Sequence, residues 1–397
     1  MEELGLIRHG AVLLRDGLVT AVGPDERICR LPAARGAKPV DAGCRVVLPG
    51  FVDSHTHALF AAPRLDEYEA RIGGSTYAGL ARAGGGIQAS ARLIRSASER
   101  SLVCRLGQVA RLFLEHGTTT IEVKSGYGLE LDGELKMLRA IREAAGRSPL
   151  EMVPTLLAHD VPRRFRRKRA RFLRVWTREL IPLVARSGLA ECCDVFCDRG
   201  YFSLRETGMV LRAAARAGLK LKVHAEQLVR SGSALLAAGL GALSADHLDH
   251  LSEADIRRLR GTPTVATLLP GTTLHLDSHP DPPARWLIDA GVPVALATNF
   301  NPGSSPTVSM QLILSLACSR LKMSPAEALT AATVNGAYAL GRGSLVGSLE
   351  VGKQADLIIM DATDYREIPY YVGMNHCVTV IKRGRVVFSR GGREARG

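Results

Sequence analysis

The sequence predicts an α/β fold in which a (β/α)8 TIM-like barrel carries a small β-sandwich domain built from both termini. Short β-branched segments alternate with Ala-, Leu- and Arg-rich helical segments through the middle of the chain, strand-like segments occur at both ends, and 397 residues exceed the usual size of one domain. About eight strand–helix units favour a closed barrel over an open sheet. We therefore expect residues 1–50 and 340–397 to form the small composite domain and residues 51–339 to form the barrel.

The two ends of the chain supply the strands of the small domain. The segment from Gly10 to Gly23 has two apolar runs on either side of Asp16-Gly17, which is the pattern of a β-hairpin. Residues 355–360 and 378–388 also have strand character. We expect both ends to share one small sheet.

The barrel strands are expected in the middle of the chain. The first is the apolar stretch that begins at Val46 and ends in the pair His55 and His57. The others are Thr118–Val123, Leu150–Leu156, Cys193–Phe196, Lys220–His224, Ala242–Asp246, Thr264–Leu268 and Val292–Ala297.

Charge and composition narrow the class of protein. Lys and Arg exceed Asp and Glu by 52 to 39, and eight of these cations lie between Arg163 and Arg174. We interpret this basic run as a solvated loop and helix start in which Phe165 and Phe172 face the core, since no nucleic-acid motif accompanies it. Binding to nucleic acid is the alternative, and it predicts steeply salt-dependent retention on DNA. No apolar run approaches the roughly 20 residues of a membrane helix, and the eight cysteines are scattered, so we expect a soluble cytoplasmic protein with reduced thiols.

The most informative segment is the stretch that ends in His55 and His57. Side chains alternate between the two faces of a strand, so imidazoles at positions i and i+2 point the same way and can bind one ion. Barrels of this kind carry their functional groups at the carboxyl ends of the strands, where this pair lies. We interpret the pair as half of a metal site.

Two further predicted strands also end in histidine, at His224 and His247. Core packing does not require three strands to deliver imidazoles to one rim. With His224 the site would have three protein ligands and open positions for water, which is typical of a hydrolytic metal. His247 would then be available as an acid, a base or the partner of an oxyanion. A polar loop, residues 299–305, follows the last strand and would face the substrate.

Together these segments resemble the amidohydrolase superfamily and, within it, the imidazolonepropionase family, over nearly the whole chain. The matching segments are Leu48-Pro-Gly-Phe-Val-Asp-Ser-His-Thr-His57, Arg64, Arg82-Ala-Gly-Gly-Gly-Ile87, Thr119-Thr-Ile-Glu-Val-Lys-Ser-Gly-Tyr-Gly-Leu129, His159, Asp194-Val-Phe-Cys197, His224-Ala-Glu-Gln227 and Asn301-Pro-Gly-Ser-Ser305. The resemblance implies hydrolysis of the ring C–N bond of 4-imidazolone-5-propanoate to N-formimidoyl-L-glutamate, a step of histidine degradation.

The resemblance also implies a set of site residues. One divalent metal, zinc or iron, would be bound by His55, His57 and His224, and His247 would stabilise or protonate the tetrahedral intermediate. The residues around the substrate would be Arg64, Tyr127, His159, Asn301, Gly303, Ser304 and Gln227, the last of which also counts among the catalytic groups. A propanoate carboxylate suits the guanidinium of Arg64. Lys124 raises the alternative of a carbamylated two-metal site, but its strand is not where such a bridge is expected, so we favour one metal.

One position departs from the family. The residue at the end of the last strand is an aspartate there, serving as metal ligand and proton acceptor, and this chain has Asn299. An amide oxygen can bind a cation weakly but cannot accept a proton at neutral pH. Three explanations stay open: His247 or Glu226 takes the proton, the metal-activated water suffices, or the chain is catalytically impaired. The family also usually has a further strand before Gly5, so we expect the small domain to be one strand short.

Two other functions remain as alternatives. A guanine- or cytosine-type deaminase would share the histidines but release ammonia, and a non-catalytic relative would bind metal without turnover. We expect a small acidic substrate as partner and neither nucleic acid nor a membrane, with a homodimer left open.

Overall fold

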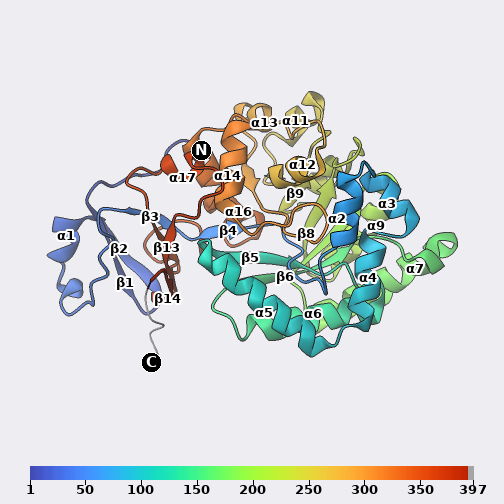
Figure 1. Cartoon of the computed structure of the whole chain (residues 1–397), viewed down its shortest axis with the longest axis horizontal. Helices are drawn as coiled ribbons and strands as arrows, with labels where there is room; N and C mark the ends of the chain where they lie inside the picture. The colour runs from blue at the N-terminus through green and yellow to red at the C-terminus, as the bar shows by residue number, and fades with distance from the viewer. Residues whose placement is uncertain (392–397) are drawn as a thin grey trace.

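The centre of the protein is a barrel of parallel strands. In the computed structural model, which describes residues 1–391, eight strands form one sheet in the order β11-β10-β9-β8-β7-β6-β5-β4 (Figure 1). They are β4 (Phe51–Asp53), β5 (Thr118–Lys124), β6 (Glu151–Ala158), β7 (Cys192–Cys197), β8 (Lys220–Ala225), β9 (Ser244–His247), β10 (Val265–Leu268) and β11 (Val294–Leu296). Just beyond the two outer strands, Asn299 N–H donates to His55 O at 3.0 Å and His57 N–H donates to Phe300 O at 2.9 Å. These bonds close the sheet, so the predicted barrel is confirmed.

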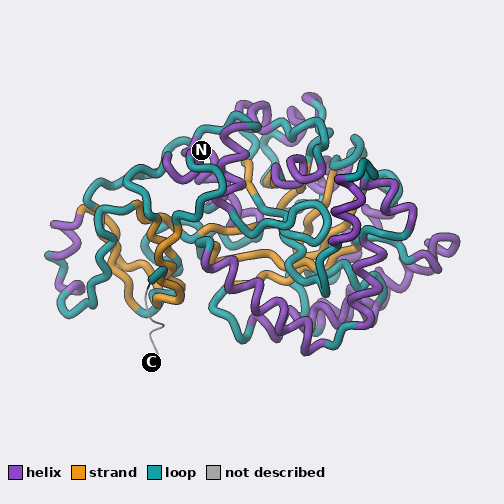
Figure 2. Tube along the Cα trace, viewed as in Figure 1, coloured by secondary structure: helices purple, strands orange, loops and turns teal. Residues whose placement is uncertain are grey.

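Helices follow the strands and surround the barrel (Figure 2). Those between β4 and β7 are α2 (Leu65–Ile72), α3 (Tyr77–Ala83), α4 (Ile87–Ser96), α5 (Glu99–Glu115), α6 (Leu131–Ala145), η2 (Arg163–Lys168), α7 (Arg169–Val175), the π-helical turn η3 (Trp176–Leu180) and α8 (Ile181–Arg186). Those after β7 are α9 (Leu204–Arg216), α10 (Ser233–Gly239), α11 (Glu253–Leu259), α12 (Pro270–Leu276), α13 (Ala284–Asp289), α14 (Met310–Ser319), α15 (Pro325–Ala332), α16 (Val334–Ala339) and α17 (Glu367–Tyr370). Among the described residues, no helix is both long and apolar enough to cross a membrane.

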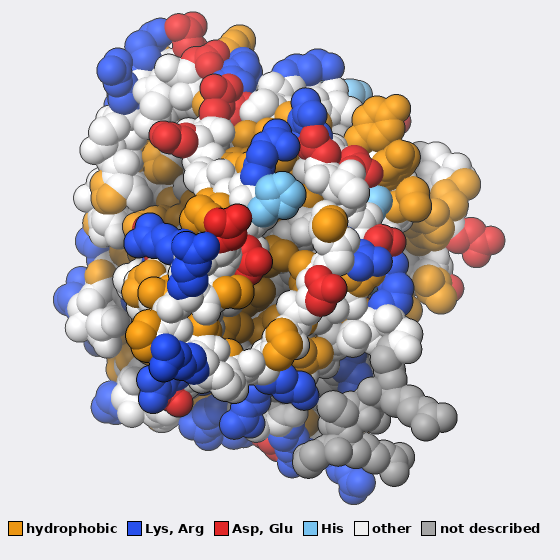
Figure 3. All heavy atoms as spheres, turned by 90° about the vertical axis from the view of Figure 1, so that its left-hand side faces the viewer, with side chains coloured by type: hydrophobic (Ala, Val, Ile, Leu, Met, Phe, Trp, Pro, Cys, Tyr) orange, Lys and Arg blue, Asp and Glu red, His pale blue; other side chains and the backbone are white. Residues whose placement is uncertain are grey.

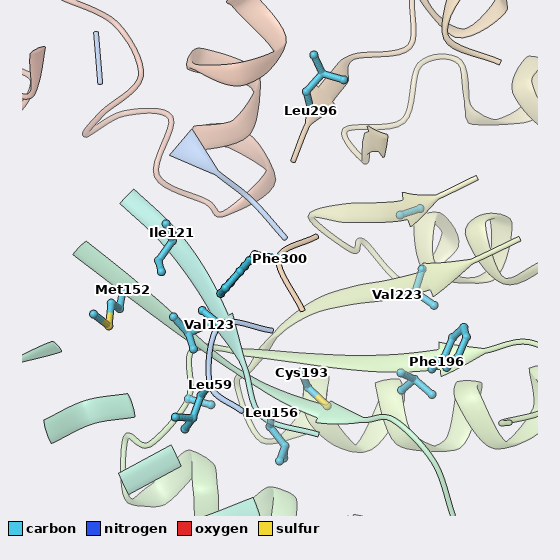
Figure 4. Close-up of a cluster of buried hydrophobic side chains, with 14 of the residues drawn as sticks. Leu59, Ile121, Val123, Met152, Leu156, Cys193, Phe196, Val223, Leu296 and Phe300 are labelled. Atoms are coloured by element: carbon cyan, nitrogen blue, oxygen red, sulfur yellow. The ribbon is translucent and has the colours of Figure 1, made fainter. Parts of the chain in front are cut away.

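Strand β5 shows how the core and the barrel interior are separated. Its apolar residues Ile121 and Val123 belong to the main hydrophobic cluster, in which Figure 4 shows them near Leu156 and Met152 of β6. Glu122 lies between these two residues and Lys124 follows them. Both are also fully buried, but they contact polar groups of other strands. Because neighbouring side chains on a strand point to opposite faces, one face packs against helices and the other lines a polar barrel interior.

Two small antiparallel sheets lie at one end of the barrel (Figure 1). Strands β1 (Gly10–Arg15) and β2 (Leu18–Pro24) form the predicted hairpin around Asp16-Gly17, and α1 (Asp25–Cys29) and η1 (Pro32–Ala34) follow it. The other sheet has the order β14-β13-β12-β3, with β3 (Val46–Pro49), β12 (Leu357–Met360), β13 (Cys377–Lys382) and β14 (Arg385–Ser389).

The expectation that both ends share one sheet is correct only for β3. The hairpin strands pair with each other, and the hairpin is attached to the C-terminal part by backbone bonds such as Val19 N–H to Lys353 O at 2.9 Å and Ala355 N–H to Gly17 O at 2.8 Å. Strand β3 instead runs antiparallel to β12 in the larger of the two sheets.

The prediction of one continuous strand from Val46 to His57 is wrong. The stretch is divided at Gly50 into β3, in the small sheet, and β4, in the barrel. A Cβ at Gly50 would lie 2.2 Å from Thr119 Oγ1, so the backbone passes β5 at a distance that only glycine allows. His55 and His57 therefore lie in the segment after β4 and not in the strand itself.

The basic run forms η2 and most of α7, with Phe172 buried and Phe165 packed against the core, as predicted. On the face shown in Figure 3, Lys and Arg side chains are spread over the surface with Asp and Glu between them. All eight cysteines are free thiols, and Cys192, Cys193 and Cys197 are buried in β7 as expected.

Candidate active site

The imidazole ring of His55 is held in place by a buried carboxylate. It is fully buried just beyond β4, and its Nδ1 lies 2.6 Å from Oδ2 of Asp246, at the end of β9. Its Nε2 has no hydrogen-bond partner among the described residues. The carboxylate accepts the proton of Nδ1, which leaves the lone pair of Nε2 for a cation.

His57 and His224 converge on each other. Their Nε2 atoms are 3.3 Å apart, and His224 Nδ1 lies 3.0 Å from Asp194 Oδ2 in β7. Two nitrogens bound to one tetrahedral zinc also lie about 3.3 Å apart, because each Zn–N bond is about 2.0–2.1 Å long. The spacing of these two nitrogens therefore fits one shared ion.

His247 lies closer to the other imidazoles than the sequence suggested. Ligand atoms of His55, His224 and His247 all lie within 4.8 Å of one another, whereas His57 approaches this group through His224. The ring centroid of His247 is 5.5 Å from that of His55 and 5.4 Å from that of His224. The described residues thus bring four imidazoles together, and His247 stands next to the place where an ion would sit.

Three of these four imidazoles are in the form that binds a metal. Burial, together with neighbouring imidazoles and Lys124, holds the pKa of His55, His57 and His247 well below its usual range. These rings are neutral at pH 7, so each keeps a lone pair on one nitrogen.

Lys124 does not have the surroundings of a carbamylated lysine. Its Nζ lies 2.5 Å from Asp194 Oδ2, 2.8 Å from Glu122 Oε2 and 3.7 Å from Asp246 Oδ2, all fully buried. Burial alone would lower the pKa of Lys124, but these three carboxylates raise it above its ordinary value. A carbamate would place another negative charge among them, so the geometry favours a protonated amine and a single-metal site.

Asn299 lies at the end of the barrel strand that closes against His55. Its Nδ2 donates to Thr272 Oγ1 at 2.8 Å, and its buried Oδ1 has no hydrogen-bond partner among the described residues. A buried oxygen left in this way is suited to a cation. Glu226, by contrast, is engaged elsewhere, because its carboxylate accepts from Ser233 N–H at 2.9 Å and Ala234 N–H at 3.2 Å at the start of α10.

The loop after β11 holds Arg64. Asn301 Oδ1 accepts from the N–H groups of Gly303 and Ser304, both at 2.8 Å, and its Nδ2 donates to Ser304 Oγ at 2.9 Å. The guanidinium of Arg64 packs on Gly303, where a Cβ would lie 1.6 Å from an Arg64 nitrogen. Glu67 approaches the same guanidinium at 3.4 Å. Asn301 thus shapes the loop, and Gly303 makes room for the cation.

This contact gives a direct test of the position of Arg64. Gly303→Ala should displace the guanidinium and raise KM for an anionic substrate by about 10- to 100-fold with little change in kcat, because a charged hydrogen bond contributes about 1.5–3 kcal/mol. Steady-state kinetics would measure both constants. Gly107→Ala is the matched control, since a Cβ at this helical position meets nothing within 4 Å. An unchanged KM in Gly303→Ala would mean that Arg64 does not bind the substrate.

The aromatic residues predicted for the substrate lie on the other side of His57. His159 stacks on His57 with ring centroids 5.0 Å apart, and Tyr127 lies 5.3 Å from His159 and 5.8 Å from His57. Burial and the charges of His224 and Arg64 lower the pKa of His159, so this ring is neutral as well. Gln227 is partly exposed in the bend after β8. Tyr127 and His159 therefore lie against the imidazole cluster, and Arg64 packs on the loop of Asn301, Gly303 and Ser304.

The sequence prediction assigned no role in the site to Asp194, Lys222 and Asp246, which contact its residues or one another. Lys222 Nζ donates to Ser244 Oγ at 2.7 Å and Ser54 O at 3.1 Å, and Ser244 donates to Asp246 Oδ1 at 2.5 Å. Charged residues inside otherwise apolar strands were the available signal, because buried charges occur almost only when they are paired.

A (β/α)8 barrel with neutral imidazoles gathered at the carboxyl ends of its strands is the architecture of a metal-dependent hydrolase. Comparison with known proteins agrees, because residues 46–387 match the profile of the Amidohydrolase family. The chain belongs to the amidohydrolase family. It is 46% identical over 394 residues to the imidazolonepropionase of Geobacillus kaustophilus (strain HTA426), covering 98% of this chain and 93% of the relative. It is also 46% identical over 391 residues to the imidazolonepropionase of Solibacter usitatus (strain Ellin6076), with the same coverage of 98% and 93%.

Solved structures extend the likeness of the fold. An adenosine deaminase from Xanthomonas campestris with bound zinc has a TM-score of 0.65 at 19% identity, covering 96% of this chain and 88% of that one. At this identity the likeness shows the shared barrel fold, and the deaminase is a distant neighbour compared with the imidazolonepropionases. The family and the cluster of buried imidazoles together support a divalent metal in this chain.

Proposed function

We propose that this protein hydrolyses the ring C–N bond of 4-imidazolone-5-propanoate to N-formimidoyl-L-glutamate. The observation that carries the proposal is the cluster of buried imidazoles together with the buried Arg64, in a chain 46% identical to curated imidazolonepropionases along 98% of its length. A propanoate carboxylate needs a cation in an enclosed site, and the guanidinium of Arg64 supplies it.

His55, His57 and His224 are the proposed ligands of one zinc or iron ion, with Asn299 Oδ1 as a weak fourth donor. His55 Nε2 and Asn299 Oδ1 have no hydrogen-bond partner among the described residues, and the Nε2 atoms of His57 and His224 lie 3.3 Å apart, which supports this donor set. Imidazoles suit both metals. When bound, the ion would activate a water molecule and polarise the ring carbonyl.

The remaining roles belong to the protein's own side chains. Arg64 binds the carboxylate of the substrate, and Tyr127, His159 and Gln227 bind the polar edge of the ring. Asn301, Gly303 and Ser304 form the opposite wall, on which Arg64 is packed. His247 accepts and returns the proton during ring opening, because its buried ring stands next to His55 and His224 and Asn299 cannot take a proton.

The proposal is tested with purified protein whose metal content is measured before it is mixed with freshly made imidazolone propanoate. We expect about one equivalent of metal, loss of the imidazolone ultraviolet absorbance, and no ammonia. Ammonia release would instead identify a deaminase, and bound metal without any loss of absorbance would identify a non-catalytic relative.

We further propose that residues 1–50 and 340–397 act as a small domain attached to the barrel of residues 51–339. The sheet that joins β3 to β12, β13 and β14 supports this division.

A further inference from the structure

A layer of buried charges lies directly beneath the imidazole cluster. It comprises Glu122, Lys124, Asp194, Lys222 and Asp246, all with fully buried side chains, and these residues come from five separate positions on β5, β7, β8 and β9. Burying so many ionisable groups is costly, since each loses its hydration. Their arrangement therefore needs an explanation beyond packing.

Two carboxylates of the layer each lie against one imidazole, Asp246 in a hydrogen bond with His55 and Asp194 in a close contact with His224. Asp194 Oδ2 lies 3.0 Å from His224 Nδ1, and Asp246 Oδ2 lies 2.6 Å from His55 Nδ1. The other oxygen of each carboxylate is also occupied, by His224 N–H at 3.1 Å for Asp194 and by Ser244 Oγ at 2.5 Å for Asp246. Neither carboxylate can rotate without losing a partner, so each fixes the nitrogen that its histidine presents to the site.

Lys124 joins the two carboxylates. Its Nζ approaches the same Oδ2 atoms that contact the imidazoles, at 2.5 Å for Asp194 and 3.7 Å for Asp246. One ammonium thus stands between two carboxylate–imidazole pairs. No other lysine of the described residues has an ion pair with Asp194.

We propose that Asp194, Asp246 and Lys124 are positioning residues for the metal site. The two carboxylates set the tautomers of His224 and His55 and supply the negative charge that the neutral amide of Asn299 does not, and Lys124 keeps both carboxylates in place. The inference rests on the metal site of the proposed function. A dication with only neutral ligands gains charge compensation through hydrogen-bonded imidazoles, which become better donors when a carboxylate holds their other nitrogen.

The test is the affinity of the metal-free protein for Zn²⁺, measured by competition with a chromophoric chelator. Asp194→Asn and Asp246→Asn preserve side-chain volume, and each is expected to raise the Kd for Zn²⁺ by about 10- to 100-fold, the range typical of such outer partners. Asp198→Asn is the matched control, because this buried aspartate follows β7 and its carboxylate accepts from the backbone N–H groups of Arg199 and Leu228. Its Kd should stay within about threefold of the parent value. Unchanged Kd values in both test variants would overturn the proposal.

The variant Lys124→Met distinguishes a positioning role of this lysine from a purely electrostatic effect of its charge on the bound cation. A lysine that acted only as a charge would repel the cation, so its removal would tighten Zn²⁺ binding, whereas loss of positioning weakens it. We expect weaker binding and an altered visible absorption spectrum of the Co²⁺-loaded protein, with thermal unfolding of the metal-free variant used to establish that it is folded. Tighter binding would overturn the role of Lys124, and if the variant does not fold, the two Asn variants decide.

A double variant tests whether the buried carboxylates compensate for the missing charge at position 299. If the layer replaces the missing carboxylate at position 299, the loss of Zn²⁺ affinity in Asp246→Asn should be several-fold smaller when Asn299→Asp is also present. Additive effects would contradict the charge role. If the parent protein takes up no metal at all, the proposed function fails; if it binds one equivalent and the Asn variants bind equally well, only this inference fails.

Discussion

His224→Ala is expected to remove the bound metal and to lower kcat/KM by about 10³-fold or more, since the loss of Lewis-acid activation costs several kcal/mol of transition-state stabilisation. His224 is the residue through which the cluster is connected, because its Nε2 is 3.3 Å from His57 Nε2 and its ring centroid is 4.4 Å from that of His55. Alanine leaves a gap on the side of β8 that no other imidazole of the described residues fills. Metal content and steady-state kinetics measure the two effects.

His116→Ala is the control for this prediction. His116 is partly exposed directly after α5, where its Nδ1 lies 2.8 Å from Leu112 O, and among the described residues it contacts none of the site residues. It should keep full metal content and activity. A His224→Ala protein that retained one equivalent of metal and its turnover would show that the ligand set is wrong.

The barrel was predictable from the sequence because strand–helix alternation is a local signal. The break at Gly50 was not, since an apolar run looks the same whether it belongs to one sheet or to two. What divides it is a contact distant in sequence, the passage of Gly50 past Thr119 of β5, together with the pairing of β3 with β12. The two strands have to be seen in their sheets before the break can be placed.

Some residues of the candidate site could likewise be predicted from the sequence, and others could not. His55, His57 and His224 could be named because strand ends of a parallel barrel meet at one rim. The partnership of His55 with Asp246 depends on the stagger of β9 against the segment after β4, which sequence spacing does not contain. The sequence argued against a carbamate bridge at Lys124 from its strand alone, whereas its position between Asp194 and Glu122 follows only from the structure of the barrel interior.

Asn299→Asp is expected to raise kcat at least about tenfold, toward the roughly 10²–10⁴-fold that a positioned acid–base group contributes. An aspartate has the same shape, and one oxygen can accept from the Thr272 hydroxyl in place of the Nδ2 bond now 2.8 Å long. The other oxygen would take the place of the buried Oδ1, which lies without a protein hydrogen bond among the described residues. A charged oxygen there binds a cation more strongly than an amide oxygen does. It can also accept a proton, which in the parent protein only His247 is proposed to accept.

Two companion variants decide how this gain arises. Asn299→Ala removes the amide without adding charge, so it should resemble the parent protein if the amide binds the metal weakly, and Zn²⁺ titration before each assay separates occupancy from turnover. His247→Asn should lower kcat by about 10²-fold or more in the parent but by less in the Asn299→Asp background, because the new carboxylate then shares the proton transfer. Equal kcat values for the parent and Asn299→Asp at full metal occupancy would contradict this account. They would mean that His247 already carries the whole proton transfer, so that the amide at position 299 limits neither metal binding nor turnover.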